Sequence, residues 1–229
     1  TPLYSSAASD VYKRQVVIVV ALLFALLIKK LPQLNKAEDI KEAPNKGISA
    51  YIQKEALPIS MVTVLVGVAY SSVLSFLTVY TSHINLATAS TFFFVVYAVS
   101  TFVTRPFTGK IYDAYGENKI MYPVLFSFIV GLVLLGLTHG SVLLLVSAIF
   151  IGVGYGTIIP SAQAIAIQQS PKDKVGLATS TFYMFTDFGA GIGPFILGIL
   201  ISFVGYRYLY VLMGCLLYTS PSPRDKRQS

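Results

Sequence analysis

The stretch "RPFTGKIYDAYGENK", residues 105–119, carries five charged side chains between two long segments, 56–104 and 120–171, that contain no Asp, Glu, Lys or Arg. Each uncharged segment is about twice the roughly 20 residues that cross the hydrocarbon core of a membrane. We therefore expect two membrane-spanning helices in each segment, with the charged stretch as a turn between two of them. Uncharged stretches of this length leave no polar outer face, which argues against a soluble helical bundle.

The composition of the chain supports a membrane protein. Of its 229 residues, 55% are hydrophobic and 12% are charged, with a mean hydropathy of +0.70, whereas soluble domains average about 25% charged residues. The net charge of +7 does not indicate nucleic acid as a partner, because the basic residues lie in short loops and not along one continuous face. Cys215 is the only cysteine, so we expect no disulfide framework, no structural metal and no cofactor.

Apolar runs predict where the helices lie. The expected spans are 57–81, 86–104, 120–137, 142–164, 177–203 and 208–217, preceded by a short run at 16–28. The runs at 16–28 and 208–217 are short, because at about 1.5 Å per residue they reach about two-thirds or less of a 30 Å core. The expected fold class is all-α, a polytopic membrane protein with a six-helix transmembrane bundle at 57–217 and a truncated helix before it.

The segments outside the bundle are polar. Residues 29–56 contain six Lys, four acidic residues, two Pro and one Gly, a composition typical of a linker. The two ends of the chain, 1–15 and 218–229, are polar and share the tripeptide "KRQ". They resemble translated sequencing-adapter sequence, and we expect them to be foreign to the protein.

Basic and uncharged connections alternate along the chain. The connections at 29–55, 105–119 and 172–174 are basic, and the two between them, "SHIN" and "THGS", are uncharged. The positive-inside rule then predicts a multi-pass protein of the cell membrane whose linker and C-terminus are cytoplasmic. Only Arg207 lies on the outer side in this topology.

The charged stretch has a defined spacing, Gly109-xxx-Asp113-xx-Gly116-xx-Lys119. Gly109, expected at a helix end, would allow close backbone approach, and Gly116 would permit a tight turn with positive φ. Asp113 is placed where its carboxylate could accept hydrogen bonds from exposed N–H groups at the start of a neighbouring helix.

This spacing resembles the loop signature G-xxx-D-xx-G-xx-[KR] of the major facilitator superfamily, in the copy between the eighth and ninth helices. The order of a short helix, a charged linker and six helices is similar to the end of helix six, the central loop and helices seven to twelve of that family. The resemblance implies a C-terminal half, with a six-helix N-terminal half of the same protein as its partner.

The resemblance also implies that Asp113 acts as a cytoplasmic latch between helices, with Arg105 or Lys110 as its partner. Ala114 and Glu117 stand where the fullest form of the motif has basic residues, which reduces the positive charge of the turn. A solvated turn that only enforces topology is the alternative.

Asp187 is the one acidic residue expected inside a span. It lies about 11 residues after Gly176, roughly 16 Å deep at helical rise and close to the middle of a 30 Å core. A charged Asp there costs on the order of 3 kcal/mol. Asp187 could carry protons, bind a cationic substrate, or hold a structural hydrogen bond to a neighbouring helix or to Thr186.

Two segments rich in glycine and proline are expected to let helices approach closely and to bend them. Their members are Gly189, Gly193, Pro194 and Gly198, with Ala190 and Gly191 between, and then Gly152, Gly154, Gly156 and Pro160. The first segment resembles the glycine-proline element of antiporters in the superfamily. That element is diagnostic in the fifth helix, so its support for antiport is weak here.

Polar residues in two spans are candidates for lining a central cavity. Ser71, Ser75 and Thr78 recur on one helical face beside Tyr70, and the tenth-helix segment contributes Tyr155 and Gln163. The resemblance implies that the seventh and tenth helices line the cavity. The alternative is that Ser and Thr bond to backbone carbonyls within the bundle. His83 and His139 are expected to be solvated loop residues.

Proton-coupled export of amphiphilic compounds is the leading functional hypothesis, because the half is apolar, aromatic-rich and carries one acid at membrane depth. Uptake or exchange of a metabolite is an alternative, as is a non-transporting membrane sensor or assembly factor on the same fold. An enzyme is not expected, because Asp187 has no second catalytic group at membrane depth, and ATP coupling is not expected without a P-loop. The expected partners are the lipid bilayer and a small-molecule substrate.

Overall fold

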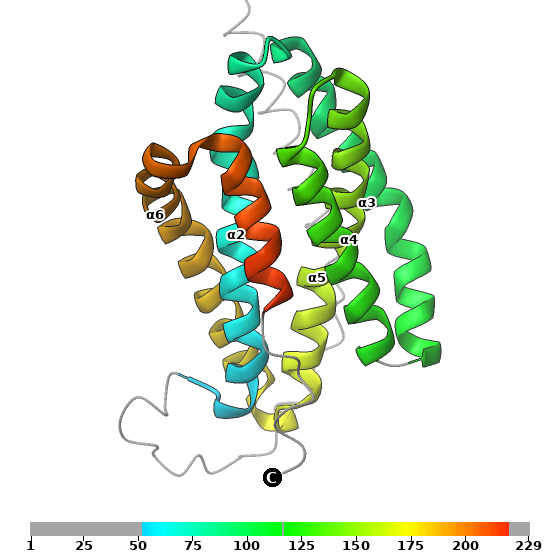
Figure 1. The fold of residues 1–229 in the computed structure, drawn as a ribbon. Helices are drawn as coiled ribbons and strands as arrows, with labels where there is room; N and C mark the ends of the chain where they lie inside the picture. The colour runs from blue at the N-terminus through cyan, green and yellow to red at the C-terminus, as the bar shows by residue number, and fades with distance from the viewer. Residues whose placement is uncertain (1–51, 116, 220–229) are drawn as a thin grey trace, which may run out of the picture. The chain divides into compact units, whose positions relative to one another are not determined.

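The computed structural model describes residues 52–115 and 117–219, and describes side chains in this range except at 111–119. All of the described elements are helical. In chain order they are η2 (Lys54–Ala56), α2 (Leu57–His83), α3 (Ala87–Tyr115), α4 (Glu117–Gly136), α5 (Ser141–Gln168), η3 (Lys172–Lys174) and α6 (Val175–Tyr218) (Figure 1). The expected truncated helix at 16–28, most of the linker, the polar end 1–15 and residues 220–229 of the other polar end lie outside the described residues.

The predicted helices are present, and α3 extends beyond its predicted end. It was expected to end at 104 but continues to Tyr115, with Pro106 inside it. The charged stretch is therefore mostly helical, and only Gly116 separates α3 from α4. The prediction of a turn throughout 105–119 is wrong, because charged side chains end a membrane span without ending its helix, and one proline removes only one backbone hydrogen bond.

The last helix, α6, joins two predicted spans across a break. Gly205 has φ 76° and ψ 168°, which are not helical values. A positive φ of this size is readily adopted by glycine. The break divides α6 into a first arm, residues 175–204, and a second arm, residues 206–218, which match the predicted runs at 177–203 and 208–217.

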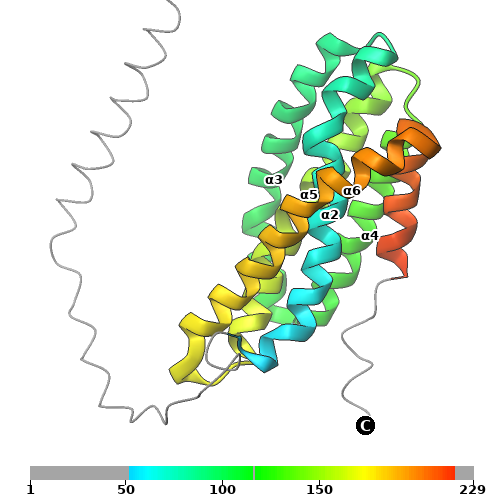
Figure 2. The ribbon, with the colours of Figure 1, turned by 90° about the vertical axis from the view of Figure 1, so that its left-hand side faces the viewer.

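The first arm of α6 runs parallel to α2. A Cβ built on Gly67 of α2 would lie 2.9 Å from the Thr186 carbonyl oxygen, and one on Gly198 would lie 3.9 Å from the Phe76 ring. Figure 2 shows the first arm crossing obliquely in front of α2. These two helices form one side of the bundle.

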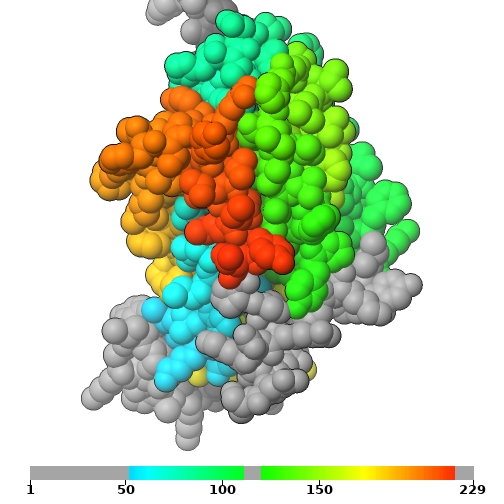
Figure 3. Space-filling view, in the orientation of Figure 1, coloured from blue at the N-terminus to red at the C-terminus, as the bar shows by residue number. Residues whose placement is uncertain are grey.

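The other side of the bundle is built by α3, α4 and α5. Gly131 and Gly154 bring α4 and α5 into antiparallel contact, and Gly152 brings α5 against α3. The second arm of α6 closes the bundle, because Gly136 of α4 and Ser72 of α2 both contact Tyr210. Figure 3 shows the second arm, in red, over the seam between α2 and α4.

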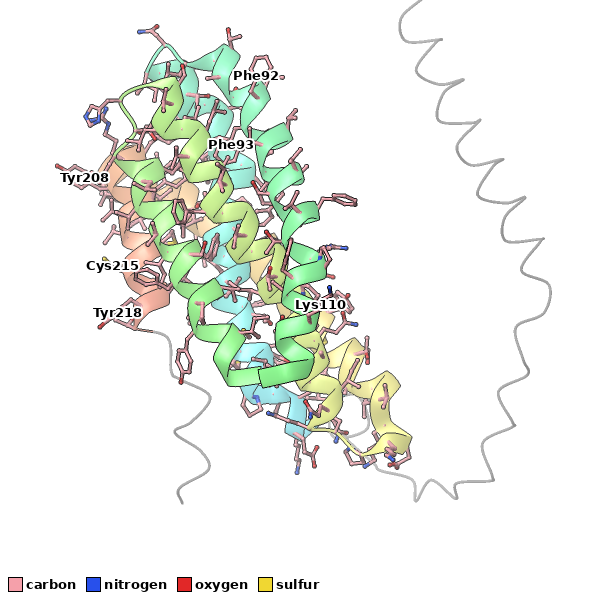
Figure 4. The ribbon with its side chains drawn as sticks, turned by 90° about the vertical axis from the view of Figure 1, so that its right-hand side faces the viewer. Phe92, Phe93, Lys110, Tyr208, Cys215 and Tyr218 are labelled. Atoms are coloured by element: carbon pink, nitrogen blue, oxygen red, sulfur yellow. The ribbon has the colours of Figure 1, made fainter. Side chains whose placement is uncertain are left out.

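The surface of the bundle carries many large apolar side chains. Phe102 of α3 is 78% exposed and Phe203 of α6 is 82% exposed. Figure 4 shows Phe92, Tyr208 and Tyr218 projecting from the outside of the bundle. Four described helical segments are long and apolar enough to cross a membrane, and the shorter apolar helix Ile120–Gly136 accompanies them. They are Lys54–His83, Ala87–Lys110, Ser141–Gln168 and Lys172–Tyr218. Large apolar side chains at the surface are consistent with a lipid environment.

Candidate functional site

Three tyrosines from three helices meet near the middle of the bundle. The ring of Tyr70 on α2 stacks on the ring of Tyr155 on α5, with centroids 3.5 Å apart and planes 10° apart. The Tyr70 hydroxyl donates a hydrogen bond to the Tyr97 hydroxyl on α3, with 3.2 Å between the oxygens. This tyrosine cluster, Tyr70, Tyr97 and Tyr155, joins α2, α3 and α5.

Asp187 lies on the first arm of α6 with an exposed side chain. Its carboxylate is close enough to interact electrostatically with Tyr155. Among the described residues it has no hydrogen-bond partner, and Thr186 donates instead to the Thr63 hydroxyl at 3.0 Å and to the Phe182 carbonyl at 2.9 Å. A hydrogen bond between Asp187 and Thr186, which was one form of the structural alternative for Asp187, is therefore not present among the described contacts.

One helical turn before Asp187, α6 makes a polar contact with α5. The Tyr183 hydroxyl donates to Gln163 Oε1 at 3.0 Å, and Tyr183 is exposed. We call the tyrosine cluster together with Gln163, Tyr183 and Asp187 the polar face. It consists of hydroxyl, amide and carboxylate groups contributed by α2, α3, α5 and α6.

The predicted row of hydroxyls on α2 does not form one lining. Ser71 is buried, donates to the Val68 carbonyl at 2.7 Å and packs against Gly193 of α6. Ser75 and Thr78 are exposed. Ser71 therefore follows the alternative expectation, a serine that bonds to backbone within the bundle, because α6 covers its part of the helical face.

Some glycines of the first arm pack against α2 and others do not. A Cβ on Gly189 would lie 2.9 Å from Val64 Cα, whereas one on Gly191 would meet no atom within 4 Å. Gly193 contacts Ser71 closely and Gly198 is in ordinary contact with Phe76. The predicted close approach is present at Gly189 and Gly193. Helical dihedrals continue through Pro194, and the described break in α6 is at Gly205.

The glycines of α5 place Tyr155 against α3 and α4. A Cβ on Gly152 would lie 2.7 Å from the Tyr97 carbonyl oxygen, and one on Gly154 would lie 2.6 Å from the Phe128 backbone nitrogen. Gly156 faces Thr101, whose hydroxyl donates to the Gly152 carbonyl at 3.0 Å. The glycine positions therefore allow the tyrosine cluster to form. Pro160 lies inside α5 without ending it.

The charged stretch is described only in part. Arg105 and Lys110 are exposed side chains of α3, and Figure 4 shows Lys110 toward the end of α3 opposite Phe92. Gly109 lies inside α3 and a Cβ there would meet no described atom within 4 Å. The expected helix end at Gly109 is therefore wrong, and the expected close approach there stays a prediction. The side chains of Asp113 and Lys119 and the conformation of Gly116 lie outside the described residues.

Within the described ranges, no three His, Cys, Asp or Glu side chains gather in a way that could hold a metal ion.

Comparison with known proteins gives the family. The family model described as Major Facilitator Superfamily matches residues 15–142 and 83–220. The chain belongs to this superfamily. With its apolar helices, it is part of a multi-pass membrane protein.

Curated relatives within the superfamily include exporters. The chain is 28% identical to "Multidrug resistance protein MdtG" of Proteus mirabilis over 161 residues, 67% of this chain and 40% of that protein. It is 26% identical to "Multi-drug resistance efflux pump PmrA" of Streptococcus pneumoniae over 67% of this chain and 40% of that protein. It is 22% identical to "Staphylopine export protein" of Staphylococcus aureus over 79% of this chain and 47% of that protein. The chain thus spans less than half the length of these superfamily relatives.

Two members of the polar face, Tyr97 and Tyr183, were not predicted from the sequence. Both are among 15 tyrosines in an aromatic-rich sequence, so residue type alone does not distinguish them. Tyr183 could have been found by its position four residues before Asp187, because residues at i and i+4 share a helix face.

Proposed function

We propose that this chain is the C-terminal half of a secondary transporter of the Major Facilitator Superfamily, and that the complete protein exports small amphiphilic compounds in exchange for protons. In this proposal, residues 57–217 form the C-terminal six-helix half, 16–28 the end of helix six and 29–56 the central loop. The family and its exporter relatives support a transporter and not an enzyme.

The observation that carries the proposal is the exposed carboxylate of Asp187 beside the tyrosine cluster. Aromatic rings supply apolar contact area with hydroxyl groups at their edges, which suits amphiphilic solutes. The carboxylate has no hydrogen-bond partner among the described residues and interacts electrostatically with Tyr155. It is therefore available either to a proton or to a cationic group of the substrate.

Basic residues gathered at one end of the bundle support a cytoplasmic location for the linker. Lys54 precedes α2, and Lys172 and Lys174 precede α6. The backbone N–H of Gln53 donates to Thr181 Oγ1 at 2.9 Å, so these basic residues lie at the same end of the bundle. Under the positive-inside rule this end faces the cytoplasm.

The test is Asp187→Asn in the complete protein, reconstituted in vesicles with a pH gradient. We expect substrate efflux to lose its dependence on the gradient and to fall at least about tenfold, because the amide cannot exchange a proton. Asp173→Asn is the matched control, since Asp173 is an exposed acid of η3 outside the polar face. Unchanged rate and pH dependence in Asp187→Asn would refute proton carriage by this residue.

The same assay separates the alternatives. Net accumulation of a metabolite, unaffected by the proton gradient, would indicate uptake or exchange. Absence of transport of any amphiphile by the folded complete protein would indicate a sensor or assembly factor on the same fold.

A further inference from the structure

Asp187 and Tyr155 interact, but they belong to different sides of the bundle. Gly189 brings the first arm of α6, which carries Asp187, against the backbone of α2. The closest contacts of the three glycines of α5, which carries Tyr155, are with α3 and α4. Close packing at these glycines therefore acts within each side, and other contacts are needed to hold α5 against the first arm. We call the line along which α5 meets the first arm the seam.

The stack of Tyr155 on Tyr70 is one contact between the two sides. Tyr70 lies on α2, and its ring centroid is 3.5 Å from that of Tyr155. Aromatic rings accept both offset and edge-to-face arrangements, so a stack alone lets one side turn relative to the other. A second contact is required to fix the first arm against α5.

A hydrogen bond next to Asp187 provides this second contact. The Tyr183 hydroxyl on the first arm donates to Gln163 Oε1 on α5, with 3.0 Å between the two atoms. Tyr183 precedes Asp187 by four residues, so the two share a helical face and lie about 6 Å apart along the helix axis. Gln163 is half-buried and Tyr183 is 42% exposed, which places the bond at the accessible edge of the seam.

Both contacts across the seam fit one antiparallel arrangement of α5 and the first arm. Gln163, the later residue of α5, pairs with Tyr183, the earlier residue of α6. Tyr155, the earlier residue of α5, interacts with Asp187, the later residue of α6. The two contacts therefore follow one another along the seam, and a change in the spacing of the helices at the first will reach the second.

We propose that Tyr183 and Gln163 are positioning residues that keep the Asp187 carboxylate beside Tyr155. The stack of Tyr155 on Tyr70 is one support and the hydrogen bond of Tyr183 to Gln163 is the other, and together they hold the first arm against α5. Neither Tyr183 nor Gln163 needs to touch the solute. The inference rests on the proposed function for the part that Asp187 plays in transport, whereas the positioning itself is a property of the folded helices.

The test measures how fast a water-soluble carbodiimide labels Asp187 in the complete protein that contains this chain, purified in detergent and analysed by mass spectrometry. Tyr183→Phe removes the donor hydroxyl, and Gln163→Met removes the acceptor at a similar side-chain length. We expect each variant to raise the labelling rate about two- to tenfold, the effect of one hydrogen bond between neutral groups, because Asp187 is then no longer held beside Tyr155. The double variant should show the same increase as either single variant, because both changes remove the same bond.

Two controls separate positioning from a general loosening of the bundle. Tyr208→Phe removes the hydroxyl of an exposed tyrosine on the second arm, outside the polar face, and should leave the labelling of Asp187 unchanged. Asp173, an exposed acid of η3, should be labelled at the same rate in every variant. An unchanged rate at Asp187 in Tyr183→Phe or Gln163→Met, effects that add in the double variant, or an equal rise at Asp173 or in Tyr208→Phe would overturn the proposal.

This outcome is distinguishable from that of the proposed function. If Asp187→Asn leaves transport unchanged but Tyr183→Phe still speeds labelling, the proposed function fails and the positioning stands. If Asp187→Asn abolishes the pH dependence of transport but Tyr183→Phe leaves labelling unchanged, the proposed function stands and the positioning is refuted.

Discussion

Replacing Gly189 with alanine should separate α2 from the first arm of α6. The added methyl group would lie 2.9 Å from Val64 Cα, 3.0 Å from its carbonyl carbon and nearer still to its oxygen. All three neighbours are backbone atoms, so no flexible side chain can move away. The contact can be relieved only if the two helices move apart.

The expected magnitude follows from two opposing effects. Overpacking against a rigid neighbour costs about 1–3 kcal/mol, and replacing glycine by alanine inside a helix gains about 1 kcal/mol. Gly191→Ala has the second effect without the first, because a methyl group there meets no atom within 4 Å. Gly189→Ala should therefore be less stable than Gly191→Ala by about 1–3 kcal/mol.

The assay compares the apparent melting temperatures of the two variants, purified side by side in the same detergent. In a chain of this size, about 1 kcal/mol corresponds to roughly 2–4 °C. Gly191→Ala should melt at or above the wild-type temperature, and Gly189→Ala below it. Equal melting temperatures of the two variants would refute the reasoning, because the difference rests on the contact with Val64 alone.

Two further variants test the interhelical bonds and the charged stretch. Thr186→Val removes the hydrogen bond to Thr63 and should cost about 1 kcal/mol in the same melting assay. Thr179→Val, whose hydroxyl bonds only within its own helix, should cost less, and an equal cost would contradict an interhelical role. Asp113→Ala should reduce transport by the complete protein more than it reduces expression if Asp113 is a latch. Proportional losses of both would instead favour a role in topology or folding.

The helix positions could be predicted from the sequence because burial in lipid requires long uncharged segments, and these stand out by composition alone. The end of α3 could not be predicted in the same way. Lys110 is charged and exposed, so it marks where the apolar segment ends, but a helix can continue into water beyond that point. Composition therefore located the span and misplaced the helix boundary.

Site residues could be predicted where a polar residue stands in an otherwise apolar segment. They could not be predicted where burial of the side chain depends on which helix packs against it. Asp187 and Gln163 stood out in apolar segments, and both belong to the polar face. Ser71 shares a helical face with Ser75, yet only Ser71 is covered by α6, through its contact with Gly193. Which part of a face another helix covers depends on a contact more than 100 residues away in the sequence, which periodicity cannot reveal.

The exposure of Asp187 bears on what covers the polar face in a membrane. Charged aspartate against lipid at the centre of a span costs on the order of 3 kcal/mol, and the side chain of Asp187 is exposed among the described helices. We infer that the polar face is turned toward water or toward a second set of helices, and not toward lipid. In the proposed carrier these helices are the N-terminal half, and the space between the two halves is where the solute binds.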